Sequence, residues 1–262
     1  MDAKDRIIFP LDVSNVDEAR RLVDQLYDYV GSFKIGLEFI NNLLTDLLIS
    51  DSVRASSLLT QARNLFSNVV AKLFWDGKLK DIPATIAGAA SGTSRLGVRM
   101  FNVHCDGGED MMKAARQAAE QYAQEHQCRR PLVLGVTVLT SLDAAAFRKM
   151  GIHCPADDLA MLVVTLAGLA KGCGLDGVIC SPHELMYLRS CDYLYGLHYV
   201  IPGVRPEWAQ VDDQKRVMTP AEAIKAGATE LVIGRPIRKP PTEIGSPIEA
   251  AKRIADEIAA AL

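Results

Sequence analysis

A short charged stretch, Asp76-x-Lys78-x-x-Asp81, follows the apolar run at residues 69–75. An apolar run of this kind predicts a buried strand, along which side chains alternate between two faces. Asp76 and Lys78 are therefore expected on one face, and Asp81 where the chain leaves the strand, shortly before Pro83 opens a helix. Burying such charges is costly unless they pair. The spacing fits equally a cluster that could stabilise charge or move protons and an exposed turn in which Asp81 caps a helix. The charges at the other strand ends favour the cluster.

Seven further strand-like segments surround this one, and most are followed by a helical stretch. Eight strands alternating with helices in about 250 residues predict a single-domain (β/α)8 TIM barrel over residues 1–262. A doubly wound sheet is the runner-up, weakened by the lack of a Gly-x-Gly-x-x-Gly turn after the first strand. Pro10 is awkward within its strand because it removes a hydrogen-bond donor. The expected strands are residues 6–13, 32–36, 69–78, 98–104, 131–139, 177–180, 198–202 and 230–234.

Polar residues recur where these strands end. In a barrel the carboxyl ends of all strands meet at one rim, where the chemistry of this fold takes place. The predicted rim thus gathers charges at positions that buried strands would otherwise fill with apolar side chains. Its members are Asp12, Lys34, Asp76, Lys78, Asn102, His104, Thr140, Ser141, Arg205, Gly234 and Arg235.

The segment 203–218 shows no apolar periodicity and is long for a loop in a compact barrel. Loops of this length are usually functional, often as lids. Loops after the seventh and eighth strands form the common phosphate site of barrels, so Gly234 and Arg235 are candidate phosphate ligands. Arg205 and Gln214 could close over the phosphate from above. The alternative is that the loop arginines are solvated surface charges.

Composition excludes several classes of protein. The net charge is −3 and the apolar content 49%, which gives no electrostatic case for binding nucleic acid or an anionic membrane. No apolar run is long enough to span a bilayer, and the first residues do not read as a signal peptide. The six cysteines contain no Cys-x-x-Cys pair and the five histidines lack metal-ligand spacing. Reduced thiols in a cytoplasmic protein without a metal are expected.

Motifs along almost the whole chain resemble orotidine 5′-phosphate decarboxylases. The Asp76-x-Lys78-x-x-Asp81 core is shared with sister sugar-phosphate decarboxylases and aldolases, whereas the Leu-Thr-Ser segment and the Pro-Gly-x-Arg tail are similar to the orotidylate branch. The matching segments are Leu11-Asp12-Val13, Phe33-Lys34-Ile35-Gly36, Asp76-x-Lys78-x-x-Asp81-Ile82-Pro83, Asn102-Val103-His104, Thr137-Val138-Leu139-Thr140-Ser141, Pro202-Gly203-Val204-Arg205, Asp213-Gln214-x-Arg216-Val217 and Val232-Ile233-Gly234-Arg235-Pro236.

The resemblance implies an enzyme of pyrimidine biosynthesis that converts orotidine 5′-phosphate to UMP and CO2 without a metal or cofactor. It implies a catalytic network of Lys34, Asp76, Lys78 and Asp81, in which Asp81 reaches into the site of the neighbouring subunit, so that the active unit is a homodimer. The implied substrate-binding residues are Asp12, Lys34, Asp76, Ile82, Pro83, Thr85, Thr140, Arg205, Gln214, Gly234 and Arg235.

Two other functions remain open at this point. One is a Mg²⁺-dependent sister activity on a sugar phosphate, either decarboxylase or aldolase, and the other is a UMP-binding barrel that has lost turnover.

The chain also departs from the family pattern: Gly77 and Lys80 are unusual residues within the charged core, Cys105-Asp106 replaces small residues, and the segment 41–67 is longer than expected. None of these departures removes a residue assigned to chemistry.

Overall fold

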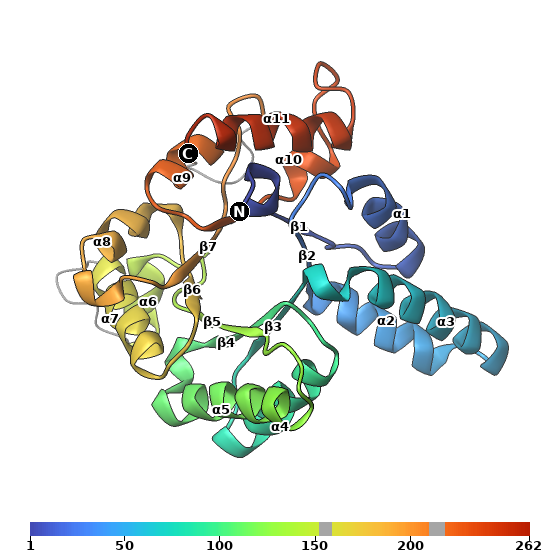
Figure 1. Ribbon diagram of the computed structural model, residues 1–262, viewed down its shortest axis with the longest axis horizontal. Helices are drawn as coiled ribbons and strands as arrows, with labels where there is room; N and C mark the ends of the chain where they lie inside the picture. Colours follow the sequence, from blue (N-terminus) through green and yellow to red (C-terminus); the bar gives the residue numbers. More distant parts are fainter. Residues whose placement is uncertain (152–158, 210–217) are drawn as a thin grey trace.

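Eight parallel strands form a closed barrel in the described part of the computed structural model, which comprises residues 1–151, 159–209 and 218–262. Each strand pairs with the next in sequence, and the first pairs with the last, which confirms the predicted (β/α)8 barrel (Figure 1). The strands are β1 (Ile7–Pro10), β2 (Ser32–Gly36), β3 (Leu73–Leu79), β4 (Met100–His104), β5 (Leu132–Val136), β6 (Gly177–Ile179), β7 (His198–Pro202) and β8 (Glu230–Val232).

Helices surround the barrel and cover the outer faces of its strands (Figure 1). The pattern of residues 38–67 predicts a helix in two pieces broken near Ser50-Asp51. This break is confirmed, because Asp51 caps a second helix by accepting the N–H groups of Val53 and Arg54. The pattern also predicts a helical stretch over 142–172 with an interruption at 151–155, which falls largely outside the described residues. The helices are α1 (Val16–Leu26), α2 (Leu37–Ile49), α3 (Ser52–Val69), α4 (Pro83–Arg95), α5 (Glu109–Glu125), α6 (Ala144–Lys149), α7 (Leu159–Gly172), α8 (Leu185–Arg189), α9 (Pro220–Lys225), α10 (Arg235–Arg238) and α11 (Pro247–Ala259).

The predicted start of the third strand at Val69 is wrong. Helix α3 continues through Val69, and a turn of 3-10 helix separates it from β3, which begins at Leu73. The reason is visible in the spacing: Ala62, Leu65 and Val69 recur at helical intervals and are all buried. Val69 is thus apolar because it faces the core from a helix, not because it belongs to the strand.

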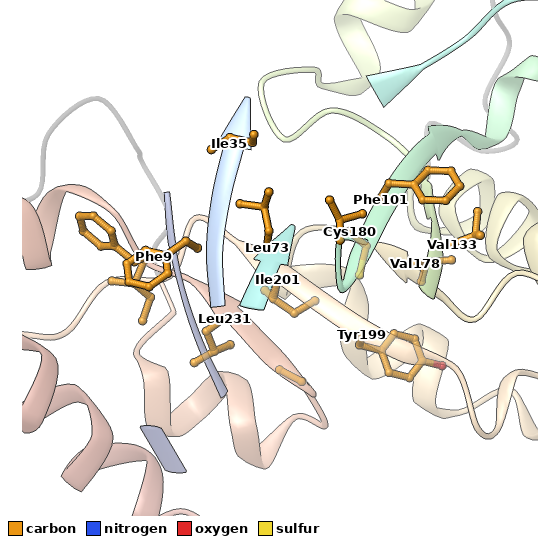
Figure 2. Close-up of a cluster of buried hydrophobic side chains, with 14 of the residues drawn as sticks. Phe9, Ile35, Leu73, Phe101, Val133, Val178, Cys180, Tyr199, Ile201 and Leu231 are labelled. Carbon is orange, nitrogen blue, oxygen red and sulfur yellow. The ribbon is translucent and has the colours of Figure 1, made fainter. Parts of the chain in front are cut away.

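Alternation along the strands divides the apolar residues into two clusters. Side chains pointing outward pack against the helices in the larger cluster, part of which Figure 2 shows with Phe9, Phe101 and Tyr199. The smaller cluster fills the middle of the barrel, as in other barrels of this type. Its buried members are Ile8, Phe74, Met100, Leu134 and Val200. Two residues further along β3 the inward-facing position is Asp76, so the charged layer lies directly above this apolar plug.

Below the plug, the strand starts carry a buried ionic network. Arg99 Nη1 and Nη2 donate to the two carboxylate oxygens of Glu230 at 2.7 and 3.0 Å, and Nη1 also donates to Ser32 Oγ. His198 Nε2 lies 2.5 Å from Glu230 Oε2. Burial acts to raise the pKa of the fully buried Glu230 carboxyl, but the contacts with His198 and Arg99 outweigh it and hold that pKa below its usual value.

Replacing Glu230→Gln is expected to lower the free energy of unfolding by about 3–5 kcal/mol at neutral pH, because Arg99 loses its buried partner. A carboxylate whose pKa is lowered by folding stabilises the protein above its unfolded-state pKa, and that contribution disappears as the pH falls through the folded-state pKa. The deficit measured by urea denaturation should therefore shrink toward acid pH. Glu249→Gln, which breaks an exposed pair with Lys252, is the control and should change little. A deficit that does not vary with pH would contradict this account.

Helices α2 and α3 lie side by side and point away from the barrel, forming an arm (Figure 1). In α2 only Phe39 is buried, although the helix is rich in leucine. Large apolar side chains near the tip are exposed, among them Leu48 at 74%, Ile49 at 76% and Val53 at 79%. Exposed apolar groups concentrated on one element are typical of an interaction surface.

In the described residues no helix combines the length and apolar character needed to cross a membrane.

Candidate active site

The inward-facing charges of β2 and β3 form a continuous chain of ion pairs at the carboxyl end of the barrel. Asp76 lies at its centre: Lys78 Nζ is 2.7 Å from Asp76 Oδ1, and Lys34 Nζ is 2.9 Å from Asp76 Oδ2. Lys34 Nζ also donates to Asp12 Oδ1 at 3.2 Å. Charges of opposite sign therefore alternate in the order Asp12, Lys34, Asp76 and Lys78. Asp76 and Lys78 lie on the same face of β3, as the alternation of side chains along a strand predicted.

Backbone geometry leaves room for these charges. Gly36 follows Lys34 on the same face of β2, and a Cβ there would lie 3.3 Å from Lys34 Nζ and 3.9 Å from Asp76 Oδ2. Such a contact with the ammonium would be tighter than packing normally permits. The absence of a side chain at Gly36 thus allows the lysine and the aspartate to approach each other.

The ion pairs keep the buried groups charged. Burial acts to raise the pKa of Asp76, but the ammonium groups of Lys34 and Lys78 outweigh it and hold the pKa below its usual value. Burial acts to lower the pKa of Lys34, but Asp76 and Asp12 outweigh it and raise the pKa. Both groups are therefore ionised at neutral pH, with only 7% of the Asp76 side chain and 12% of the Lys34 side chain exposed.

An irregularity in β3 turns Lys78 into the mouth of the barrel. Trp75 pairs with Phe101 and Leu79 pairs with Val103, so three residues of β3 oppose the single residue Asn102 of β4. Lys78 adopts a left-handed conformation with φ of 47°, which is uncommon for a residue with a side chain. Such bulges are frequent next to active sites, where they redirect a side chain.

Above the network lies a cavity of about 340 Å³, large enough for a small organic molecule. The lining of the cavity includes the ion pairs and also Arg205, Gly234 and Arg235, which follow β7 and β8. Apolar side chains line it as well. They include Phe74, Val136, Val138, Leu139, Ile179 and Val232. This arrangement suits an elongated ligand with an apolar ring near the lysines and an anionic group near the arginines.

Comparison with known proteins assigns the chain to a family. The sequence model of the "Orotidine 5'-phosphate decarboxylase / HUMPS family" matches residues 5–254. The chain belongs to this family. It is 40% identical to an orotidine 5′-phosphate decarboxylase from Syntrophotalea carbinolica, over 100% of this chain and 98% of the relative, and 42% identical to one from Trichlorobacter lovleyi, over 99% and 97%. The crystal structure of the Lactobacillus acidophilus orotidine 5′-phosphate decarboxylase is similar, with a TM-score of 0.72 and 29% identity over 96% of this chain and 98% of that one.

Of the site residues inferred from the resemblance to this family, eight line the cavity. They are Asp12, Lys34, Asp76, Lys78, Thr140, Arg205, Gly234 and Arg235. Arg205 is buried although it lies in a loop, with 7% exposure, unlike a solvated surface charge. The eight come from six different strand ends or the loops that follow, so the topology of the barrel brings together residues more than 200 positions apart.

The remaining predicted site residues do not line the cavity of this single chain. Asp81, Ile82, Pro83 and Thr85 are exposed at the start of α4, and Ile82 is 65% exposed. Asp81 Oδ1 accepts the backbone N–H of Ile82 at 2.7 Å, but Ile82 is itself the N-cap of α4 and the helix has no side-chain cap. Gln214 lies outside the described residues, as do Asp213 and Arg216.

Two of the departures from the family pattern compensate each other. Lys80 Nζ lies 2.7 Å from Asp106 Oδ2, and both side chains are about half exposed. The extra positive charge of Lys80 is thus paired outside the cavity with a carboxylate that is itself unusual at its position. The unusual Gly77 also has a local reason, because a Cβ there would meet Trp75 Nε1 at 2.8 Å.

Pro10, which was awkward as a strand residue, is explained by its neighbour. It is the last residue of β1, and β8 has ended at Val232, so the ladder between the two strands stops at this level. A Cβ at Gly234 would lie 2.7 Å from Pro10 Cγ. The proline ring therefore packs against the glycine backbone next to Arg235 in the sequence, and both Pro10 and Gly234 line the cavity.

Sequence reasoning did not assign a role to Asn102, which the structure places behind Asp76. Its side chain is fully buried and contacts both members of the Asp76–Lys78 pair. Its position at the end of β4 next to the charged strand was the available signal. Among the described residues, no group of three or more His, Cys, Asp or Glu side chains is arranged to hold a metal ion.

Proposed function

We propose that the chain decarboxylates orotidine 5′-phosphate to UMP and CO2, the reaction named in its family and its relatives. The observation that carries this proposal is the Lys78 ammonium, 2.7 Å from the buried Asp76 carboxylate and lining a cavity that Arg205 and Arg235 also line. A pyrimidine ring near the lysines and a phosphate near the arginines would fill this cavity in one orientation.

Breaking the bond between C6 and the carboxylate carbon leaves an electron pair on C6, with no adjacent carbonyl group to delocalise it directly. The chain must therefore stabilise the developing charge electrostatically. We infer that Lys78 provides this stabilisation and then donates a proton from Nζ to C6, which completes UMP. Lys34 and Asp76 keep the network ionised and Lys78 directed toward the cavity.

Repulsion between Asp76 and the substrate carboxylate is a smaller contribution. Two like charges about 4 Å apart repel by roughly 4 kcal/mol at an effective dielectric constant near 20. Enzymes typically lower barriers by about 8–23 kcal/mol. Stabilisation of the carbanion by Lys78 must therefore supply the greater share, with binding of the distant phosphate paying for orientation.

Arg205, Gly234 and Arg235 are proposed to bind the phosphate, with Gln214 as a further ligand. Asp12 and Thr140 also line the cavity and are proposed to contact the nucleotide. Charge-assisted hydrogen bonds from arginine are well suited to a phosphate dianion.

Arg235→Ala is expected to weaken UMP binding by about 10- to 100-fold, the typical loss for a hydrogen bond to a charged group. Titration calorimetry with UMP measures the effect. Arg253→Ala removes an exposed arginine from α11, away from the cavity, and serves as the matched control. Equal UMP affinities for Arg235→Ala and the unmodified protein would refute this phosphate assignment.

The active unit is proposed to be a homodimer in which Asp81 completes the site of the partner. Two features support it. The exposed start of α4 places Asp81 and Ile82 in solvent beside the rim, and Asp81 does not line the cavity of its own chain. The arm formed by α2 and α3, which includes the long segment 41–67, begins at the same rim and exposes apolar side chains that association would cover.

A cytoplasmic location is also proposed. The cysteines of the described residues are all free thiols, as is usual for proteins of a reducing compartment.

Absorbance of orotidine 5′-phosphate during incubation with the purified protein, with and without EDTA, tests the function. Loss of substrate to UMP that is indifferent to EDTA is the expected result. Turnover of a sugar phosphate that EDTA abolishes would instead favour the Mg²⁺-dependent sister activity that shares the family. Binding of UMP without any turnover would favour a barrel that has lost catalysis.

A further inference from the structure

We propose that Asn102 is a positioning residue that holds the bulge of β3 and thereby fixes both Asp76 and Lys78 for the reaction. Asn102 does not line the cavity, so it acts through its neighbours and not by touching the substrate. This inference rests on the proposed decarboxylation for its kinetic effect, but its structural part can be tested without turnover.

The side-chain amide of Asn102 makes one contact with each member of the ion pair. Its Nδ2 donates to Asp76 Oδ1 at 2.6 Å, and its Oδ1 accepts the backbone N–H of Lys78 at 2.8 Å. The chemistry of the partners fixes the orientation of the amide, since a carboxylate oxygen can only accept and a backbone N–H can only donate. Asn102 is fully buried, so water does not substitute for either contact.

These contacts occur where regular strand pairing fails. Between the pairs Trp75–Phe101 and Leu79–Val103, the residues 76–78 of β3 face Asn102 alone. The N–H of Lys78 therefore has no regular place in the ladder, and the Asn102 side chain supplies an acceptor instead. Because Lys78 is held at φ of 47°, a conformation unfavourable for a lysine, an external contact is needed to keep it there.

The same amide completes the coordination of Asp76. Oδ1 of Asp76 accepts from Lys78 Nζ and from Asn102, while Oδ2 faces Lys34 Nζ. The carboxylate is thus held from three directions by β2, β3 and β4. Neither a carboxylate nor an apolar side chain of similar size can replace the amide: an aspartate would repel Asp76, and a leucine would leave both groups without a partner.

Asn102→Leu and Asn102→Asp are therefore expected to lower kcat by about 100-fold, the loss typical of a misplaced catalytic group. UMP binding should change by less than about threefold, because Asn102 does not itself line the cavity. Thr137→Val is the matched control. Thr137 is also buried near the rim and donates to a backbone carbonyl, that of Ile179, but it does not contact the ion pairs. Its kcat should stay close to that of the unmodified protein.

A crystal structure of Asn102→Leu provides the readout that is independent of activity. Lys78 is expected to leave the left-handed conformation, with its ammonium displaced from Asp76. Should Asn102→Leu not fold, Asn102→Ser carries the test, because the single hydroxyl oxygen of a shorter side chain cannot take the places of both amide atoms, Nδ2 and Oδ1. An unchanged Lys78 backbone, or a kcat within threefold of the unmodified protein, would overturn the inference. Failure of the unmodified protein to turn over orotidine 5′-phosphate would overturn the proposed function alone, since the crystallographic test stands apart.

Discussion

Lys78→Ala is expected to lower the kcat for orotidine 5′-phosphate by at least about 10⁴-fold. Two contributions combine in this estimate: loss of a positioned proton donor costs about 10²–10⁴-fold, and loss of a preorganised charge costs about 10²–10³-fold. Asp76 would also lose the partner 2.7 Å from its Oδ1, so that Asp12 and Asp76 would share the single positive charge of Lys34.

UMP affinity should change far less, by under about tenfold, because the phosphate and the pyrimidine ring keep their contacts with the rest of the cavity. Single-turnover kinetics and UMP titration measure the two quantities separately. Lys113→Ala removes a lysine of α5 that pairs with Glu109 on the surface, and it controls for the loss of a positive charge. Near-normal turnover by Lys78→Ala would remove the basis of the mechanism.

Local sequence patterns were enough to predict the barrel and most of the cavity. Along β3 the residues Phe74, Asp76 and Lys78 occupy alternate positions, so a strand that buries Phe74 inside the barrel must direct Asp76 the same way. Parallel strands also bring all their carboxyl ends to one rim. Strand periodicity and barrel topology together therefore place Lys34, Asp76 and Arg235 around one cavity.

What the sequence did not predict depends on pairing between distant segments. The bulge at residues 76–78 exists only relative to β4, and no pattern within β3 reveals that Asn102 replaces a regular partner. The contact between Pro10 and Gly234 likewise joins the two ends of the chain. Val69 was misassigned because a buried apolar residue at the end of a helix has the same composition as the start of a strand.

Mixing two inactive variants is expected to restore activity if Asp81 acts across a subunit interface. Asp81→Ala and Lys78→Ala are each expected to be nearly inactive alone. In a mixed dimer, one site carries both substitutions, while the other combines the intact Lys78 of one chain with the intact Asp81 of its partner. Random exchange of subunits makes half of the dimers mixed, each with one complete site, so activity should rise to about a quarter of that of the unmodified protein.

The mixing experiment distinguishes an Asp81 that acts in the partner's site from one that acts in the site of its own chain. Within one chain its carboxylate accepts the N–H of Ile82 and does not line the cavity, so an Asp81 that served its own site would have to move there. In that case each mixed dimer would contain two defective sites, and no mixture would regain activity. Exchange is verified by mass spectrometry of dimers with one isotopically labelled chain. Recovered activity would therefore assign Asp81 to the partner's reaction, and verified exchange without recovery would contradict a role across the interface.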